Sequence, residues 1–157
     1  LIGILSAGCV SLERLAGVQD VKEPVIILSS AVEPAWTATT EESASTPQHR
    51  RVLEQAQVRT VTGEVVDVSC FLQLGKRGEA HVPCGQKCVL RGQPVGVLTD
   101  ERKLYLVIAE EHHPRRDGEV TLKERFADLM AKRVQVSGMV TEYKDYRAVF
   151  VSTLPEQ

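Results

Sequence analysis

The stretch that decides the fold is residues 103–143, which read KLYLVIAEEHHPRRDGEVTLKERFADLMAKRVQVSGMVTEY. Apolar residues alternate with the others over residues 103–109 and again over 133–143, which is typical of β-strands with one buried face. Between them, Thr121-Leu122-Lys123-Glu124 has the form of a capping box, whose hydroxyl and carboxylate satisfy free backbone amides at a helix start. An apolar face follows it. The pattern predicts a strand, a helix over residues 121–131, and a second strand.

Three further strands are predicted around this unit. Valines spaced along residues 58–70 indicate a long first strand, which Gly63 allows to bend. Residues 93–99 pair with 103–109 in a hairpin, and residues 147–154 follow a turn at 144–146. Five strands with a helix between the third and the fourth is the order of an OB-type barrel. We therefore expect a mainly β fold: a five-stranded OB-like barrel over residues 57–157, preceded by an irregular N-terminal arm.

A short helix is predicted between the first and second strands. Pro83 suits the first turn of a helix, and Gly92 suits its C-terminal stop. Cys84 and Cys88 are four positions apart, so they lie on one face of this helix.

The barrel region resembles a protein family. The run Gly63-Glu64-Val65-Val66-Asp67 with Cys70, followed by His81, Cys84 and Cys88, is similar to small, largely uncharacterised bacterial envelope proteins with a GxVVDxxC opening and an HxxCxxxC helix. These proteins are usually secreted or membrane-tethered. The resemblance covers about residues 61–152 and implies a fold rather than an activity.

The N-terminal segment, residues 1–18, is expected to be a membrane tether or a signal remnant. Leu5-Ser6-Ala7-Gly8-Cys9 resembles a bacterial lipobox, although Ser6 occupies the position where Leu is favoured. Cys9 would then be the lipid attachment site. The alternative is a short buried helix with a free thiol. A tether predicts a location in the bacterial cell envelope, membrane-anchored on the periplasmic side.

Residues 19–56 are predicted to be an extended arm that binds a partner. Pro24, Pro34 and Pro47 interrupt helices, and residues 37–46 are small and polar without a period. Two apolar islands interrupt the arm, namely Val25-Ile26-Ile27-Leu28 and Trp36. Either they contact a partner protein, with Trp36 as the anchor, or they pack back onto the barrel. A short amphipathic helix over residues 48–57 leads into the barrel.

The residues that carry chemistry are Cys70, His81, Cys84 and Cys88. In an oxidising envelope, a disulfide from Cys70 to Cys88 would tie the inserted helix to the first strand. Alternatively, all four residues bind zinc or copper in a tetrahedral site. A third alternative is redox chemistry at Cys84 and Cys88, although the thioredoxin-type Cys-x2-Cys spacing is absent.

Composition excludes several functions. The net charge is −2, with no basic excess in either part of the chain, and the chain has only three Phe, three Tyr and one Trp. Nucleic acid is therefore not an expected partner. No motif for a catalytic triad, a phosphate loop or a dinucleotide is present, so we expect no enzyme activity, cofactor or small-molecule substrate. Two hypotheses remain: a structural subunit that binds a larger membrane protein complex, possibly respiratory or photosynthetic, or a periplasmic metal-binding or redox protein.

Overall fold

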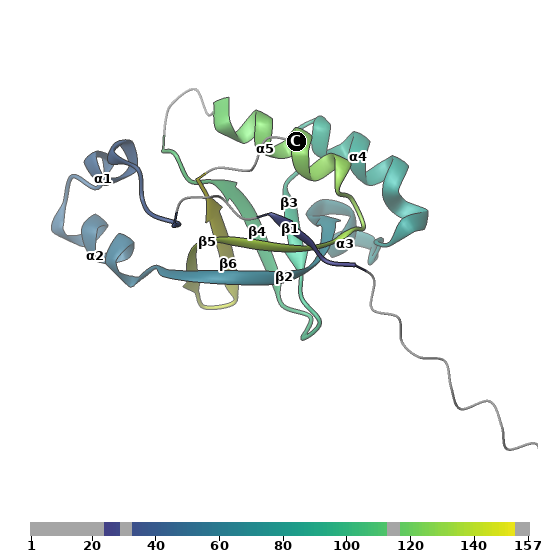
Figure 1. The fold of residues 1–157 in the computed structure, drawn as a ribbon, viewed down its shortest axis with the longest axis horizontal. Helices are drawn as coiled ribbons and strands as arrows, with labels where there is room; N and C mark the ends of the chain where they lie inside the picture. Colours follow the sequence, from purple (N-terminus) through teal and green to yellow (C-terminus); the bar gives the residue numbers. More distant parts are fainter. Residues whose placement is uncertain (1–23, 29–32, 113–116, 153–157) are drawn as a thin grey trace, which may run out of the picture.

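The computed structural model describes residues 24–28, 33–112 and 117–152, and their strands form a closed barrel (Figure 1). Within this part of the chain the barrel strands are β2 (Gln57–Asp67), β3 (Val95–Leu98), β4 (Leu104–Ala109), β5 (Arg133–Tyr143) and β6 (Tyr146–Val151). They are hydrogen-bonded in the order β2-β3-β4-β6-β5, and β5 returns to β2. Strands β4 and β6 are parallel, and the other barrel pairs are antiparallel. The predicted five-stranded, mainly β barrel is confirmed.

The core lies inside the barrel and is built largely from valines of the predicted strands. Val65, Val97, Val134 and Val149 have no exposed surface, because alternate residues of each strand point inward. Helix α5 (Asp117–Asp128) lies between β4 and β5, as predicted, and places Phe126 in the same core. The helix thereby covers one side of the barrel, next to α4 (Figure 1).

Two glycines allow the long strands to approach their neighbours closely. A Cβ atom added at Gly63 would collide with the backbone carbonyl of Leu98, and one added at Gly138 with that of Phe150. Glycine is therefore required at both positions by the backbone packing of the barrel.

The first barrel strand is shorter than predicted. It ends at Asp67 rather than Cys70, because the Asp67 carboxylate accepts hydrogen bonds from the amides of Ser69 and Cys70 and starts helix α3 (Val68–Leu74). Gly75 ends this helix in the left-handed conformation, at φ 66°. Cys70 therefore lies on a helix and not on a strand.

The start of α5 also differs from the prediction. The helix begins at Asp117, so Thr121 lies one turn inside it and is not the capping residue. The capping-box prediction is wrong, since the amides after Thr121 already belong to a continuing helix.

The N-terminal arm is more ordered than predicted. It contains β1 (Ile26–Leu28), α1 (Ala38–Ser43) and α2 (Pro47–Gln55), the last close to the predicted helix over residues 48–57. Strand β1 pairs in parallel with β5, and Leu28 is only 1% exposed. The Trp36 ring meets the Phe150 ring edge-on at 5.3 Å. Of the two alternatives for the apolar islands, packing on the barrel is observed for Leu28 and Trp36.

Residues 1–23 lie outside the described part of the chain, so the predictions for residues 1–18 and for Cys9 are not addressed by the fold. In the described part, no helix has the length and apolar character needed to cross a membrane.

Candidate metal centre

Three short helical elements connect β2 to β3 and carry the predicted site residues. After α3 come the 3₁₀ turn η1 (Glu79–His81) and helix α4 (Val82–Leu90), which begins with Pro83 in its first turn as predicted. Gly92 follows at φ 100°, a backbone conformation that favours glycine. The insertion brings His81, Cys84 and Cys88 back to Cys70 on α3.

The four predicted site residues come together, and a fifth residue joins them. The potential ligand atoms of Cys70, His81 and Cys84 lie within 4.8 Å of one another, and those of Asp67, Cys70 and Cys88 also lie within 4.8 Å of one another. Cys70 is common to both groups. We call these five residues the thiol cluster.

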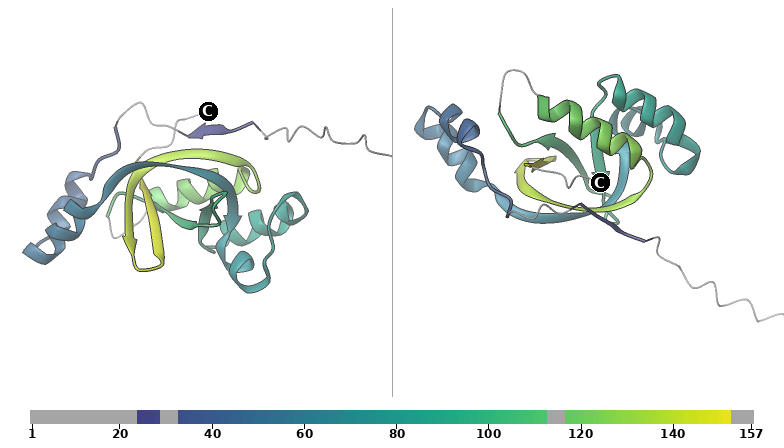
Figure 2. Two further views of the ribbon diagram at one scale, coloured as in Figure 1. Left: turned by 90° about the horizontal axis from the view of Figure 1, so that it is seen from below. Right: turned by 45° about the horizontal axis from the view of Figure 1, so that its top comes forward.

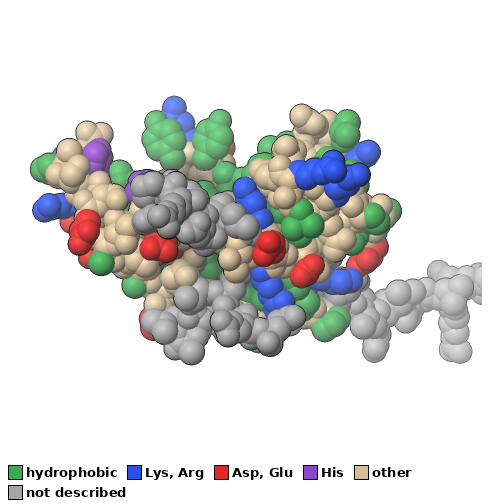
Figure 3. Space-filling model, turned by 90° about the horizontal axis from the view of Figure 1, so that it is seen from above, with side chains coloured by type: hydrophobic (Ala, Val, Ile, Leu, Met, Phe, Trp, Pro, Cys, Tyr) green, Lys and Arg blue, Asp and Glu red, His purple; other side chains and the backbone are tan. Residues whose placement is uncertain are grey.

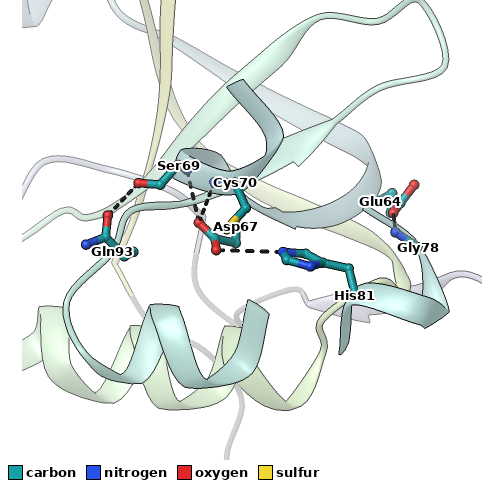
Figure 4. A network of polar contacts seen from close by, with 7 residues as sticks. All are labelled: Glu64, Asp67, Ser69, Cys70, Gly78, His81 and Gln93. Carbon is teal, nitrogen blue, oxygen red and sulfur yellow. Dashed lines mark hydrogen bonds and ion pairs between the residues drawn. The ribbon is translucent and has the colours of Figure 1, made fainter. Parts of the chain in front are cut away.

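Asp67 of the thiol cluster lies beside Cys70 and faces the His81 ring (Figure 4). Its side chain is completely buried, and its Oδ2 atom is 3.8 Å from Nε2 of His81, which is itself 7% exposed. Within the described residues, neither of these two atoms has a partner at normal hydrogen-bond geometry. The other oxygen of this carboxylate, Oδ1, accepts hydrogen bonds from the amides of Ser69 and Cys70 at the start of α3.

Polar contacts around the thiol cluster hold its loop in place. Glu64 accepts a hydrogen bond from the amide of Gly78 at 2.7 Å and forms an ion pair with Arg77 at 2.7 Å. On the other side, the Ser69 hydroxyl donates to the side chain of Gln93. Figure 4 shows the contact of Glu64 with Gly78 and the contact of Ser69 with Gln93, and it does not draw Arg77. They position η1 and α3 relative to β2, as outer contacts do around metal ligands.

The thiols of Cys70 and Cys88 bind their protons tightly in the absence of a cation. The weak hydrogen bond of the Cys70 thiol to the Asp67 carboxylate, together with burial and nearby negative charge, raises the pKa of Cys70 to about 12. The pKa of Cys88 is raised by burial first, and then by Asp67 and Cys84. A bound metal ion would reverse this effect, because its charge favours thiolates.

The predicted disulfide between Cys70 and Cys88 is not formed in this structure, where Cys70, Cys84 and Cys88 are free thiols. Because the Cys70 and Cys88 sulfur atoms are within 4.8 Å of each other, they are close enough to be joined by a modest movement. The disulfide stays a prediction for the oxidised protein.

Sequence reasoning missed Asp67 as a member of the site. The signal for Asp67 was the helix start: an Asp directly before Val68 and Ser69, at the end of a run of valines, is a typical N-cap. Burial of that cap against the inserted helix could not be read from the sequence.

Charged side chains on the face shown in Figure 3 do not form a continuous basic surface, since Lys and Arg are interspersed with Asp and Glu.

No family model matches the chain, and no curated protein or solved structure gives a significant match. Fold and site together define a class: a closed OB-type barrel whose insertion carries a cluster of thiols, an imidazole and a buried carboxylate. The resemblance to bacterial envelope proteins stays a prediction.

Proposed function

We propose that this protein is a non-catalytic metal-binding protein, in which Cys70, His81, Cys84 and Cys88 hold one zinc-type ion. The observation that carries the proposal is the clustering of their ligand atoms at Cys70: those of Cys70, His81 and Cys84 lie within 4.8 Å of one another, and the Cys88 sulfur lies within 4.8 Å of the Cys70 sulfur. The Nε2 atom of His81, which is buried, has no hydrogen-bond partner among the described residues and is available as a ligand.

The donor types favour zinc or another soft ion over magnesium or calcium. Sulfur and imidazole nitrogen are soft to intermediate ligands, whereas the harder cations prefer oxygen. In a tetrahedral site with Zn–S bonds of about 2.3 Å, neighbouring sulfurs lie roughly 3.8 Å apart. The Cys70 sulfur lies within 4.8 Å of the Cys84 sulfur and of the Cys88 sulfur, so small rotations of the cysteine side chains can bring them to that spacing.

The number of donors favours a structural role. Four protein ligands leave no open position for a substrate, and closed four-ligand zinc sites are structural. The ion would connect α3 to α4 across the insertion, where a predicted disulfide would make the same connection. A reduced protein would then bind metal, and an oxidised one would form the bridge.

Metal content of the reduced full-length chain tests this proposal. We expect stoichiometric zinc after equilibrium dialysis, and cobalt in its place should give the absorption of a tetrahedral thiolate complex. Cys84→Ser removes one ligand and should lower the stoichiometry at limiting zinc. Cys9→Ser is the matched control, because it makes the same change outside the thiol cluster and should leave zinc binding intact.

Reduced, folded protein that binds no zinc would contradict the proposal. Equal losses in Cys84→Ser and Cys9→Ser would contradict the assignment of the site.

A second candidate is the assembly subunit, tethered to the envelope membrane through Cys9 and docked on a larger membrane protein complex. Strand β1 favours this candidate, since it lies at the edge of the sheet and pairs only with β5 among the described strands. Ile27 is 60% exposed there and Val25 39%. An exposed apolar edge strand offers both backbone groups and side chains to a partner.

Replacing Ile27 by aspartate tests the second candidate. We expect Ile27→Asp to reduce co-purification with an envelope complex from native membranes, with a change in the free energy of unfolding of only about 0.5 kcal/mol. Val58→Asp is the control, because Val58 is exposed to a similar extent, 53%, on a barrel strand. Retention of the complex by Ile27→Asp, or equal loss in both variants, would count against docking through β1.

A further inference from the structure

A pocket of about 520 Å³ lies between the helices of the arm, away from the thiol cluster. We call it the Trp36 pocket. Its apolar walls come from Trp36, Ala44 and Leu53. Its charged groups are Glu41, Glu42, Glu54 and Arg50.

The wall formed by Trp36 is fixed to the barrel. The indole Nε1 donates a hydrogen bond to the Leu53 carbonyl at 3.1 Å, and the ring packs edge-on against Phe150. The next residue, Thr37, caps α1 and donates its amide to the side chain of Glu110 at 2.8 Å; Glu110 is only 3% exposed. Because its N–H is already engaged, the Trp36 ring offers the pocket only its apolar surface.

The charges of the Trp36 pocket are predominantly negative. Three carboxylates surround it, and within the described part of the chain none of them forms an ion pair. The single cation, Arg50, donates to the carbonyl of Ala44 at the end of α1. The pocket thus combines an apolar interior with a surplus of negative charge.

We infer that the Trp36 pocket binds a basic segment of a partner protein by taking one of its Arg or Lys side chains. Such a side chain has an apolar stem and a cationic head, which match the indole wall and the carboxylates respectively. A cation near an indole face gains additional attraction. Helices α1 and α2, whose residues line the pocket, project from the barrel (Figure 2). This inference does not depend on metal binding.

Fluorescence provides a direct test, because Trp36 is the only tryptophan of the chain. The full-length protein is titrated with an acetylated peptide of alternating arginine and leucine, and with the same peptide carrying neutral citrulline in place of arginine. We expect the arginine peptide to shift the emission of Trp36 saturably and the citrulline peptide to bind at least about ten-fold more weakly. Raising the salt concentration should weaken the arginine complex, because exposed charge pairs are screened.

Variants separate the pocket from general charge attraction. The combined replacement Glu41→Gln, Glu42→Gln and Glu54→Gln should weaken the arginine peptide about ten-fold, the sum expected for three exposed pairs. Glu124→Gln, an exposed carboxylate on α5, should leave binding unchanged. These surface changes leave the core intact, which the melting temperature checks.

Three results would overturn the inference. The first is equal binding of the citrulline peptide, and the second is equal weakening by Glu124→Gln and the triple variant. The third is binding of free arginine amide as tightly as the peptide, which would indicate a small-molecule site instead of a partner site.

Discussion

Cys70→Ser is expected to weaken zinc binding at least about 100-fold, since even the loss of an outer contact around a metal typically costs 10- to 100-fold. Cys70 belongs to both groups of neighbouring ligand atoms, so its replacement affects whichever of the other residues complete the site. A competition titration of the reduced full-length chain against a zinc indicator measures the change. Leu72→Ala is the control, because Leu72 is 68% exposed on the same helix α3 and is not a member of the thiol cluster.

The pH dependence of zinc binding gives an independent measure of the same site. Binding requires thiolates, whereas the Cys70 pKa of about 12 and the raised pKa of Cys88 keep these thiols protonated near neutral pH. The apparent affinity should therefore rise with pH, by about ten-fold per pH unit for each thiol that must lose its proton. Removing Cys70 should reduce the slope of the logarithm of the zinc affinity against pH by one, because one thiol fewer must lose its proton. An apparent affinity that stays constant between pH 7 and 8.5 would contradict thiolate ligation.

Gly138→Ala is expected to lower the stability of the fold by about 3 kcal/mol or more, because the closest atom that the new Cβ meets belongs to the backbone. The added Cβ would collide with the Phe150 carbonyl and lie 2.8 Å from a methyl group of Val149, both on β6. Relief requires β5 and β6 to separate, although their pairing contributes to closing the barrel. Urea unfolding followed by circular dichroism measures the loss.

Gly75→Ala separates this collision from the general effect of adding a methyl group to glycine. Nothing lies within 4 Å of the Cβ atom added there, so only the left-handed backbone at φ 66° opposes it. That conformation costs an L-residue about 1–2 kcal/mol. A Gly138→Ala variant as stable as Gly75→Ala would show that the two strands tolerate a wider separation than the close packing indicates.

The two proposed functions use different parts of the molecule and can be tested separately. The thiol cluster lies in the insertion between β2 and β3, whereas β1, α1 and α2 belong to the arm. Leu28 and Trp36 pack on the barrel, so no partner protein is needed to bury these two apolar side chains. What remains for a partner is the surface that the arm leaves exposed: Ile27 on β1 and the Trp36 pocket.

The sequence by itself determined the barrel and four of the five residues of the thiol cluster. Alternation in residues 104–109 and 133–143 predicts strands because side chains of a strand point alternately to opposite faces. Pro83 and Gly92 delimit a helix because one fixes φ and the other adopts positive φ, and both effects are local. This local information alone predicts the helix that is inserted between the first two strands and carries Cys84 and Cys88.

Only the tertiary structure decided the partners of residues that are distant in the sequence. Pairing of Ile26–Leu28 with β5 joins residues more than 100 positions apart, and a three-residue apolar run carries no information about which strand it will meet. Similarly, Asp67 could be recognised as a helix start, but its position beside His81 depends on how the insertion packs. The packing of the insertion, which no local sequence pattern encodes, places this capping aspartate within the candidate metal site.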